Sequence, residues 1–196
     1  ALRAKGLGAH VIVTEVNTIR ALEALMDGYK VMPLAEAAAT GDIFITVTGC
    51  AGVIGFEHIE KMKDGALLCN AGHFDVEIDV KALEERALEK RAIKKNITAY
   101  RFADKSIFLL AGGRLVNLSA ADGHPAEIMD LSFSIQALAI DYLRKNQGLL
   151  PAKVIPAPYE IDEKVARIKL KTAGVSIDAL SKKQVDYLSS WKNEKE

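Results

Sequence analysis

The sequence predicts an α/β fold in which a doubly wound parallel sheet is followed by a long helix and a helical C-terminal segment. Two patterns support this prediction. In the first half of the chain, short apolar runs rich in β-branched residues alternate with stretches of helical periodicity, as in parallel strands joined by crossover helices. Later, residues 125–145 keep an apolar helical pattern for about six turns, which is too long for a strand.

The elements of the first part follow from apolar spacing and from the positions of glycine and proline. Residues 1–5 have the pattern of a helix end that stops at Gly6 or Gly8. The β-branched run 10–15 predicts a buried parallel strand, and the helical spacing of 18–27 is stopped by Gly28. The next expected elements are a short helix from Pro33 to about Gly41, a strand over 43–47, a helix over 56–62, a strand over 66–69, and a helix over 80–90 whose charges face outward.

The second part begins with a predicted hairpin and continues with helices. Strands over 100–102 and 106–110 are expected to flank a turn at 103–105. Apolar residues occupy most of the circumference of the helix over 125–145, so we expect this helix to be buried. The remaining expected elements are an extended segment marked by Pro151, Pro156 and Pro158, and helices over 161–170 and 182–190.

Composition and charge exclude several classes of function. The chain has 196 residues, 49% hydrophobic and 27% charged, with a formal net charge of +0, which fits one domain, or a domain and part of another. A balanced charge gives no electrostatic basis for binding nucleic acid or an anionic membrane, and no apolar run is long enough to span a bilayer. We expect a cytoplasmic protein, because no signal peptide is visible and two cysteines do not form a disulfide framework.

The cysteines and histidines show no spacing typical of zinc ligands. Cys50 and Cys69 fit the pattern of small buried hydrophobic residues better than that of nucleophiles. The sequence therefore predicts no metal site.

Polar residues follow three of the predicted strands, and in an open parallel sheet ligands bind beyond the carboxyl ends of the strands. These positions are Glu15, the turn at 48–50 and the segment 70–73. An acidic residue that closes the second strand of a dinucleotide-binding unit accepts hydrogen bonds from ribose hydroxyls, and its charge disfavours a 2′-phosphate. Glu15 therefore predicts NAD rather than NADP, although a solvated carboxylate at a strand end is the plainer interpretation.

The same rule places a glycine-rich pyrophosphate loop about 20 residues before the acid, which is before Ala1. Gly6 and Gly8 do not replace this loop, because no strand precedes them and no helix follows. We therefore expect the sheet to lack its first strand and its glycine-rich loop.

Two motifs resemble the S-adenosyl-L-homocysteine hydrolase (adenosylhomocysteinase) family. They are Asn-Ala-Gly-His-Phe-Asp-Val-Glu-Ile at 70–78 and Gly-Arg-Leu-Val-Asn-Leu followed by Gly-His-Pro within 113–125. The resemblance extends from residue 1 to about Trp191. Without it, 113–125 would be an ordinary loop that ends a strand and begins a helix with Pro125 at its first position.

The resemblance implies a domain organisation. Residues 1–122 would be a Rossmann-like NAD-binding domain without its first strand, and 123–150 a hinge and helix that return to the substrate domain. Residues 151–196 would be a segment for subunit contact, in a homo-oligomer that is a tetramer. The larger part of the substrate domain lies N-terminal in this family, so this chain would correspond to the C-terminal part and be inactive alone.

The resemblance also implies site residues. His73 would be catalytic, by polarising the reacting ribose, and Asn117 would hydrogen-bond the nicotinamide carboxamide. The cofactor contacts would be Glu15, Asn17, Arg20, Thr48, Gly49, Cys50, Ala71, Gly72, His73 and Asn117. The substrate contacts would be His73, His124, Met129 and Phe133. From the residues alone, His73 is equally a polar strand end, Asn117 an Asx turn, and Met129 and Phe133 core residues.

The implied reaction is the reversible hydrolysis of S-adenosyl-L-homocysteine to adenosine and L-homocysteine. Bound NAD would oxidise the ribose 3′-hydroxyl, which acidifies the C4′ proton so that a base removes it and the thiol is eliminated. Water would then add, and the ketone would be reduced again. The main acid–base residues would come from outside this chain.

Two departures from the family pattern and two rival interpretations remain. Gly112 stands where the family usually has Glu, and the chain resembles members with a short C-terminal tail. One rival is a protein related to 2-hydroxyacid dehydrogenases, although no Arg/Glu/His catalytic set follows the strands. The other rival is a non-catalytic assembly or regulatory module of the same family.

Overall fold

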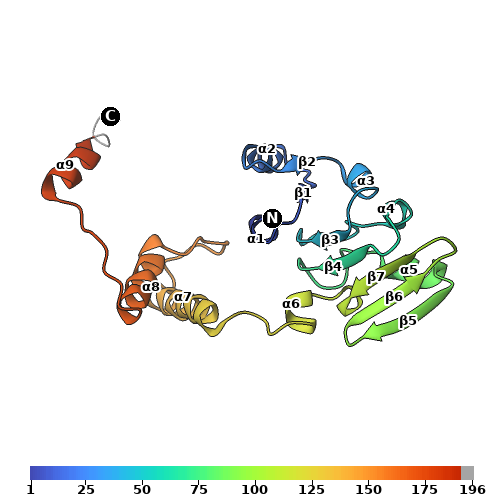
Figure 1. Cartoon of the computed structure of the whole chain (residues 1–196). Helices are drawn as coiled ribbons and strands as arrows, with labels where there is room; N and C mark the ends of the chain where they lie inside the picture. Colours follow the sequence, from blue (N-terminus) through green and yellow to red (C-terminus); the bar gives the residue numbers. More distant parts are fainter. Residues whose placement is uncertain (191–196) are drawn as a thin grey trace. The chain divides into compact units, whose positions relative to one another are not determined.

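The computed structural model of the chain describes residues 1–190 and divides it into two compact units (Figure 1). The first unit spans Ala1–Gly123 and the second begins at His124. Trp191 and the other last residues of the predicted subunit-contact segment lie outside the described residues.

The first unit alternates short strands and helices. Its elements, in chain order, are α1 (Leu2–Gly6), β1 (Ile12–Val13), α2 (Thr18–Met26), β2 (Lys30–Val31), α3 (Leu34–Ala37), β3 (Ile43–Thr46), α4 (Phe56–Ile59), β4 (Leu67–Asn70), α5 (Val80–Arg86), β5 (Glu89–Lys94), β6 (Ile97–Arg101), β7 (Ser106–Leu110), the 3₁₀ turn η1 (Ala111–Gly113) and α6 (Val116–Ser119).

The main sheet has five strands in the order β3-β4-β7-β6-β5 (Figure 1). β3, β4 and β7 are parallel neighbours, whereas β6 runs antiparallel to both β7 and β5. The short strands β1 and β2 form a separate parallel pair. The predicted α/β fold with a mainly parallel sheet is confirmed, as are the 100–110 hairpin and the helix ends at Gly6 and Gly28.

Several expectations for single elements need correction. The predicted buried strand 10–15 is only two residues long and half-buried. Among the described strands it pairs with β2, which is itself only two residues long and was not expected from the sequence, so the pairing covers just two residues of each strand. The predicted helix 80–90 ends at Arg86, where Ala87 turns to an extended conformation and Leu88 donates its N–H to the carbonyl of Arg101. The chain then enters β5, which was also not expected. η1 and α6 lie between the predicted strand 106–110 and the predicted helix that begins at 125, where the sequence indicates no regular element.

One face of the main sheet carries the core. Phe44, Leu68 and Leu109 lie next to one another across three paired strands, and all three are buried. Helices on this face contribute Ile59 from α4 and Leu83 from α5, each 0% exposed. Burial of one such side chain contributes about 1.5–3 kcal/mol, so this layer fixes the sheet on which the loops of the site are carried.

The second unit is helical. Its elements are α7 (Ala126–Lys145), α8 (Tyr159–Thr172) and α9 (Lys182–Ser190), which match the three helices predicted for this part. α8 packs along α7, and Lys169 forms an ion pair with Asp130 at 2.9 Å. The expected burial of the first helix is wrong for the described chain, because α7 has no buried residue and Ile140 is 67% exposed. Its apolar residues surround the helix, but α8 packs along one side only.

Candidate functional site

Two turns begin side by side where β3 and β4 end. Thr46 is paired with Asn70 in the register of the two strands, so the strands end at the same level. The N–H of Ala71 donates to the carbonyl of Thr46 at 2.8 Å. The predicted site segments 48–50 and 71–73 therefore leave the sheet from neighbouring positions.

A buried carboxylate joins these two turns. Glu77 is 0% exposed, and each of its oxygens accepts two hydrogen bonds. Oε2 accepts from the N–H and the hydroxyl of Thr48 at 3.2 and 3.1 Å. Oε1 accepts from the N–H of Gly49 at 2.7 Å and from that of His73 at 2.9 Å. One side chain thus fixes the turn after β3 against the segment after β4.

The hydrogen bonds also determine the charge of Glu77. Burial by itself raises the pKa of this carboxyl, but the hydrogen bonds from Thr48 and Gly49 outweigh burial, with a further contribution from the nearby Thr46 hydroxyl. The pKa of Glu77 therefore lies below its ordinary value of 4.5, and the group is a carboxylate at neutral pH.

Asn70 brings a third segment to the same place. Its Oδ1 accepts from the hydroxyl of Thr46 at 3.3 Å and from the N–H of Gly72 at 2.9 Å. Its Nδ2 donates to the carbonyl of Gly113 at 2.9 Å, and its backbone forms a parallel bridge with Leu115. The half-buried Asn117, which lies in α6, follows two residues later. The 70–78 motif and the start of the second motif, residues 113–115, are therefore adjacent in the fold, although they are far apart in sequence.

The residues around the end of β1 have local partners of their own. Glu15 Oε1 accepts from the N–H groups of Asn17 and Val16 at 2.9 and 2.7 Å, and these bonds hold the pKa of Glu15 below its ordinary value of 4.5. Asn17 caps α2 through hydrogen bonds from the N–H groups of Ile19 and Arg20. Arg20 forms an ion pair with Glu23 at 3.0 Å. Glu15 is thus a charged, exposed acceptor, whereas Asn17 and Arg20 have structural contacts within their own helix.

The remaining site residues predicted for the first unit are mostly accessible. Thr48, Gly49, Ala71 and His73 are exposed, and Gly72 is half-buried. Cys50 is exposed, so the expectation that both cysteines are buried is wrong for this one. Cys69 is buried as expected, and this burial raises the pKa of its thiol.

Three predicted substrate residues belong to the second unit. Met129 is half-buried on α7, and His124, just before the helix, is exposed. Phe133 is 58% exposed, which does not fit the plain interpretation of this side chain as a core residue.

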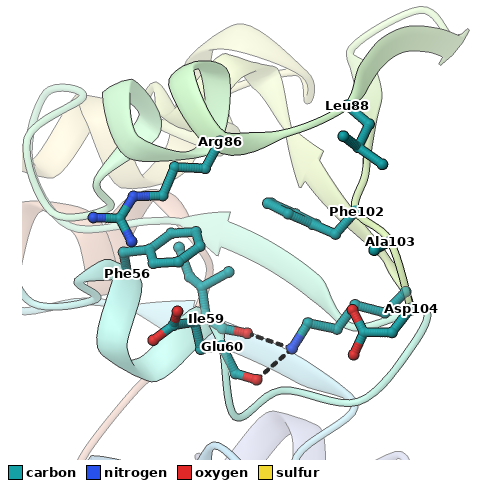
Figure 2. A pocket seen from close by; sticks show the side chains of 9 residues that line it. Phe56, Ile59, Glu60, Arg86, Leu88, Phe102, Ala103 and Asp104 are labelled. Carbon is teal, nitrogen blue, oxygen red and sulfur yellow. Dashed lines mark hydrogen bonds between the residues drawn. The ribbon is translucent and has the colours of Figure 1, made fainter.

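A hollow of about 440 Å³ lies at the other end of the main sheet, where β7 begins (Figure 2). Its cations have partners within the chain. Lys105 Nζ donates to the carbonyls of Ile59, Glu60 and Met62, and the guanidinium of Arg86 lies 4.1 Å from the ring centroid of Phe56. These contacts close the end of α4 and indicate a structural role for this region.

Two absences apply to residues 1–190 only. Within this range no group of three or more His, Cys, Asp or Glu side chains is arranged to hold a metal ion. No helix in the same range combines the length and apolar character needed to cross a membrane.

The sequence model of a family described as S-adenosyl-L-homocysteine hydrolase, NAD binding domain, matches residues 1–123. The chain belongs to the S-adenosyl-L-homocysteine hydrolase family. Similar proteins include the adenosylhomocysteinases of Archaeoglobus fulgidus (57% identical over 98% of this chain and 47% of the relative) and Thermococcus kodakarensis (58% over 98% and 46%). The S-inosyl-L-homocysteine hydrolase of Methanocaldococcus jannaschii is 56% identical over 98% of this chain and 46% of its own length. The chain thus spans about half the length of these relatives.

NAD is the cofactor of the matched S-adenosyl-L-homocysteine hydrolase domain, whose fold is Rossmann-like. The residues present fit this molecule. Glu15 offers an ionised, exposed acceptor for ribose hydroxyls just after β1, as expected for NAD rather than NADP. At Gly72, a Cβ atom would lie 2.0 Å from Glu77 Oε1, so only glycine lets the backbone of this segment pack directly against the carboxylate.

The sequence placed Asn70 within the strand-end segment 70–73 without assigning it a contact, and it did not single out Glu77. Both lie in the 70–78 motif, and each is 0% exposed. The available signal was the acid within the apolar run Val-Glu-Ile, which is unusual for an exposed carboxylate. Its partners at 48 and 49 come from another strand and are not indicated by the local sequence.

Proposed function

We propose that this chain is the NAD-binding part of an adenosylhomocysteinase that reversibly hydrolyses S-adenosyl-L-homocysteine to adenosine and L-homocysteine. The similarity to adenosylhomocysteinases along nearly the whole chain is the observation that carries this proposal. It includes the segments 48–50 and 70–78, which Glu77 holds together. We propose a cytoplasmic homo-oligomer, a tetramer, with residues 151–196 in the contacts between subunits.

Each exposed segment then has a role in binding the cofactor. The Glu15 carboxylate accepts hydrogen bonds from the adenosine ribose hydroxyls of NAD, with Asn17 and Arg20 nearby in sequence. The turn at 48–50 passes along the cofactor, and Asn117 hydrogen-bonds its nicotinamide carboxamide. Ala71 and Gly72 supply backbone that approaches the nicotinamide closely. When bound, NAD supplies reversible hydride acceptance at the 3′-carbon of the substrate ribose.

The substrate contacts come from both units. His73 lies between the proposed cofactor and substrate ribose positions, where its imidazole polarises the reacting hydroxyl. His124, Met129 and Phe133 contact the adenosine. The groups that move the C4′ proton belong to parts of the enzyme outside this chain, so residues 1–196 alone are proposed to be inactive.

Turnover of S-adenosyl-L-homocysteine by the full-length protein that carries this chain tests the proposal. Released L-homocysteine is measured by its thiol, and S-inosyl-L-homocysteine is run in parallel because one 56% identical relative is named for that substrate. We expect faster turnover of the adenosyl compound. Preferred turnover of the inosyl compound would reassign the substrate, and a folded protein inactive on both would favour the non-catalytic assembly module.

A further inference from the structure

Glu77 connects the turn at 48–50 to the segment 71–73 through specific hydrogen bonds and not only through packing. Its four hydrogen bonds run to residues of the segments 48–50 and 71–73, both of which are proposed to contact NAD. A charge without exposure to water is costly unless it is fully hydrogen-bonded, so this arrangement constrains both oxygens of the carboxylate.

We propose that Glu77 is a positioning residue, which sets the turn at 48–49 and the backbone of His73 in the arrangement that NAD and the substrate ribose require. This inference rests on the proposed function. Glu77 itself, being 0% exposed, acts through these two turns.

The geometry makes a carboxylate specifically necessary at this position. All four bonds are donated to Glu77, three by backbone N–H groups and one by a hydroxyl. A glutamine has the same size but only one acceptor oxygen, so its amide NH₂ would face either the two donors of Thr48 or the N–H groups of both Gly49 and His73. Glu77→Gln therefore disturbs the relative position of the turns without leaving a cavity.

The close approach of Gly72 to the Glu77 carboxylate provides a second way to test this positioning role. A Cβ atom at this residue would lie 2.0 Å from Oε1 and 2.6 Å from Cδ of Glu77. Gly72→Ala must therefore displace the carboxylate while leaving its charge and all of its partners in the sequence.

The test measures the NAD dissociation constant and the rate of NADH formation after adenosine is added, in full-length wild-type and variant proteins. We expect Glu77→Gln to weaken NAD binding by about 10- to 100-fold, the effect of losing charge-assisted hydrogen bonds. We also expect slower NADH formation at saturating NAD, because the His73 backbone is misplaced. A purely structural role would lower thermal stability and leave both values unchanged in the folded fraction.

Asp79→Ala is the matched control. Asp79 lies two residues from Glu77 and caps α5 by accepting from the N–H of Ala82 at 3.0 Å, but it does not contact either turn. We expect this variant to lose thermal stability and keep the wild-type NAD dissociation constant. Equal loss of NAD binding in Asp79→Ala and Glu77→Gln would overturn the inference.

A double-mutant cycle completes the test. If Gly72 and Glu77 act through one contact, the combined variant loses clearly less than the product of the two single losses. If the losses in NAD affinity of the two single variants multiply fully in the double variant, the inference is overturned. If Glu77→Gln does not fold, Gly72→Ala serves as the test, and normal NAD binding by that variant would overturn the inference. A wild-type protein that neither contains NAD nor reacts with adenosine would instead contradict the proposed function.

Discussion

At the scale of single residues, Glu77 shows how hydrogen bonds decide the charge of a buried group. Burial alone favours the neutral acid, whereas the hydrogen bonds from Thr48 and Gly49 favour the anion. Because the pKa is lower in the folded chain than the ordinary value of 4.5, the carboxylate stabilises the fold only while it is ionised.

The sign of this effect predicts how stability depends on pH. The contribution of Glu77 is fully present above its ordinary, unfolded pKa of 4.5 and is lost as the pH falls toward the lower folded value. We expect the free energy of unfolding of the wild type to fall more steeply than that of Glu77→Gln between about pH 5 and pH 3. Urea denaturation at a series of pH values measures both slopes.

Glu84→Gln is the control for loss of a carboxylate. The side-chain hydrogen bond from Lys90 lowers the pKa of Glu84, but this pair is exposed and screened by solvent. Its effect on the slope should be smaller than that of Glu77→Gln. Parallel pH profiles for the wild type and Glu77→Gln would show that Glu77 is not a stabilising carboxylate.

Gly112, a smaller departure from the expected family pattern, has a limited structural effect. Its φ is +63°, and no atom beyond its chain neighbours lies within 4 Å of the position that a Cβ would occupy. The Glu that the family usually has would therefore meet no steric obstacle and would carry only the backbone cost of a left-handed conformation, about 1 kcal/mol. The absence of this acid thus changes the surface next to Gly113 rather than the packing.

At the scale of elements, the differences in predictability have physical causes. β3 and β4 were predictable because apolar side chains such as Phe44 and Leu68 must be buried. β5 was not predictable, because it is an edge strand whose residues are all exposed. Its charged residues occur in a pattern that is also typical of the exposed side of a helix. Its pairing with β6 depends on backbone hydrogen bonds, which leave no apolar pattern in the sequence.

Lys105 provides a prediction at this scale. Its ammonium donates to the carbonyls of Ile59, Glu60 and Met62 at and just after the end of α4, and so joins that helix to the turn before β7. Figure 2 shows the first two of these hydrogen bonds. Lys105→Met should lower the free energy of unfolding by about 1–3 kcal/mol, because these carbonyls lose their charged partner. Chemical denaturation of the variant and the wild type measures the difference.

Lys63→Met is the matched control for that prediction. Lys63 forms an ion pair with Asp42 at 2.9 Å, but both side chains are largely in solvent. Its replacement should cost less than about 1 kcal/mol. Equal losses in the free energy of unfolding for the two lysine variants would contradict the stabilising link that Lys105 makes between α4 and the turn before β7.

At the scale of the whole molecule, the α/β class and the positions of the 48–50 and 70–73 segments at strand ends could be predicted from the sequence. The link between them could not. Glu77 and Gly49 are separated by 28 residues and meet only because β3 and β4 are parallel neighbours. Likewise, the position of Gly113 next to Asn70 depends on the complete sheet order.

Exposed apolar side chains lead to a prediction about association. Phe133, Ile140 and Leu143 on α7 are each more than half exposed. Exposed apolar surface of this kind marks contact sites. We expect residues 1–196, expressed alone, to associate with increasing concentration in sedimentation experiments, and we expect Ile140→Lys with Leu143→Glu to reduce this association. A monodisperse monomer at all concentrations would contradict a contact role for this helix.

The segments held together by Glu77 and Asn70 are proposed above to belong to an NAD site, and the cofactor content of the protein tests this directly. The measurement is to denature the purified full-length protein that carries this chain and to quantify the NAD released. We expect about one NAD per chain, because the cofactor is regenerated in each cycle and is retained. A folded protein that releases no NAD, and takes up none when it is supplied, would contradict an NAD site at these segments.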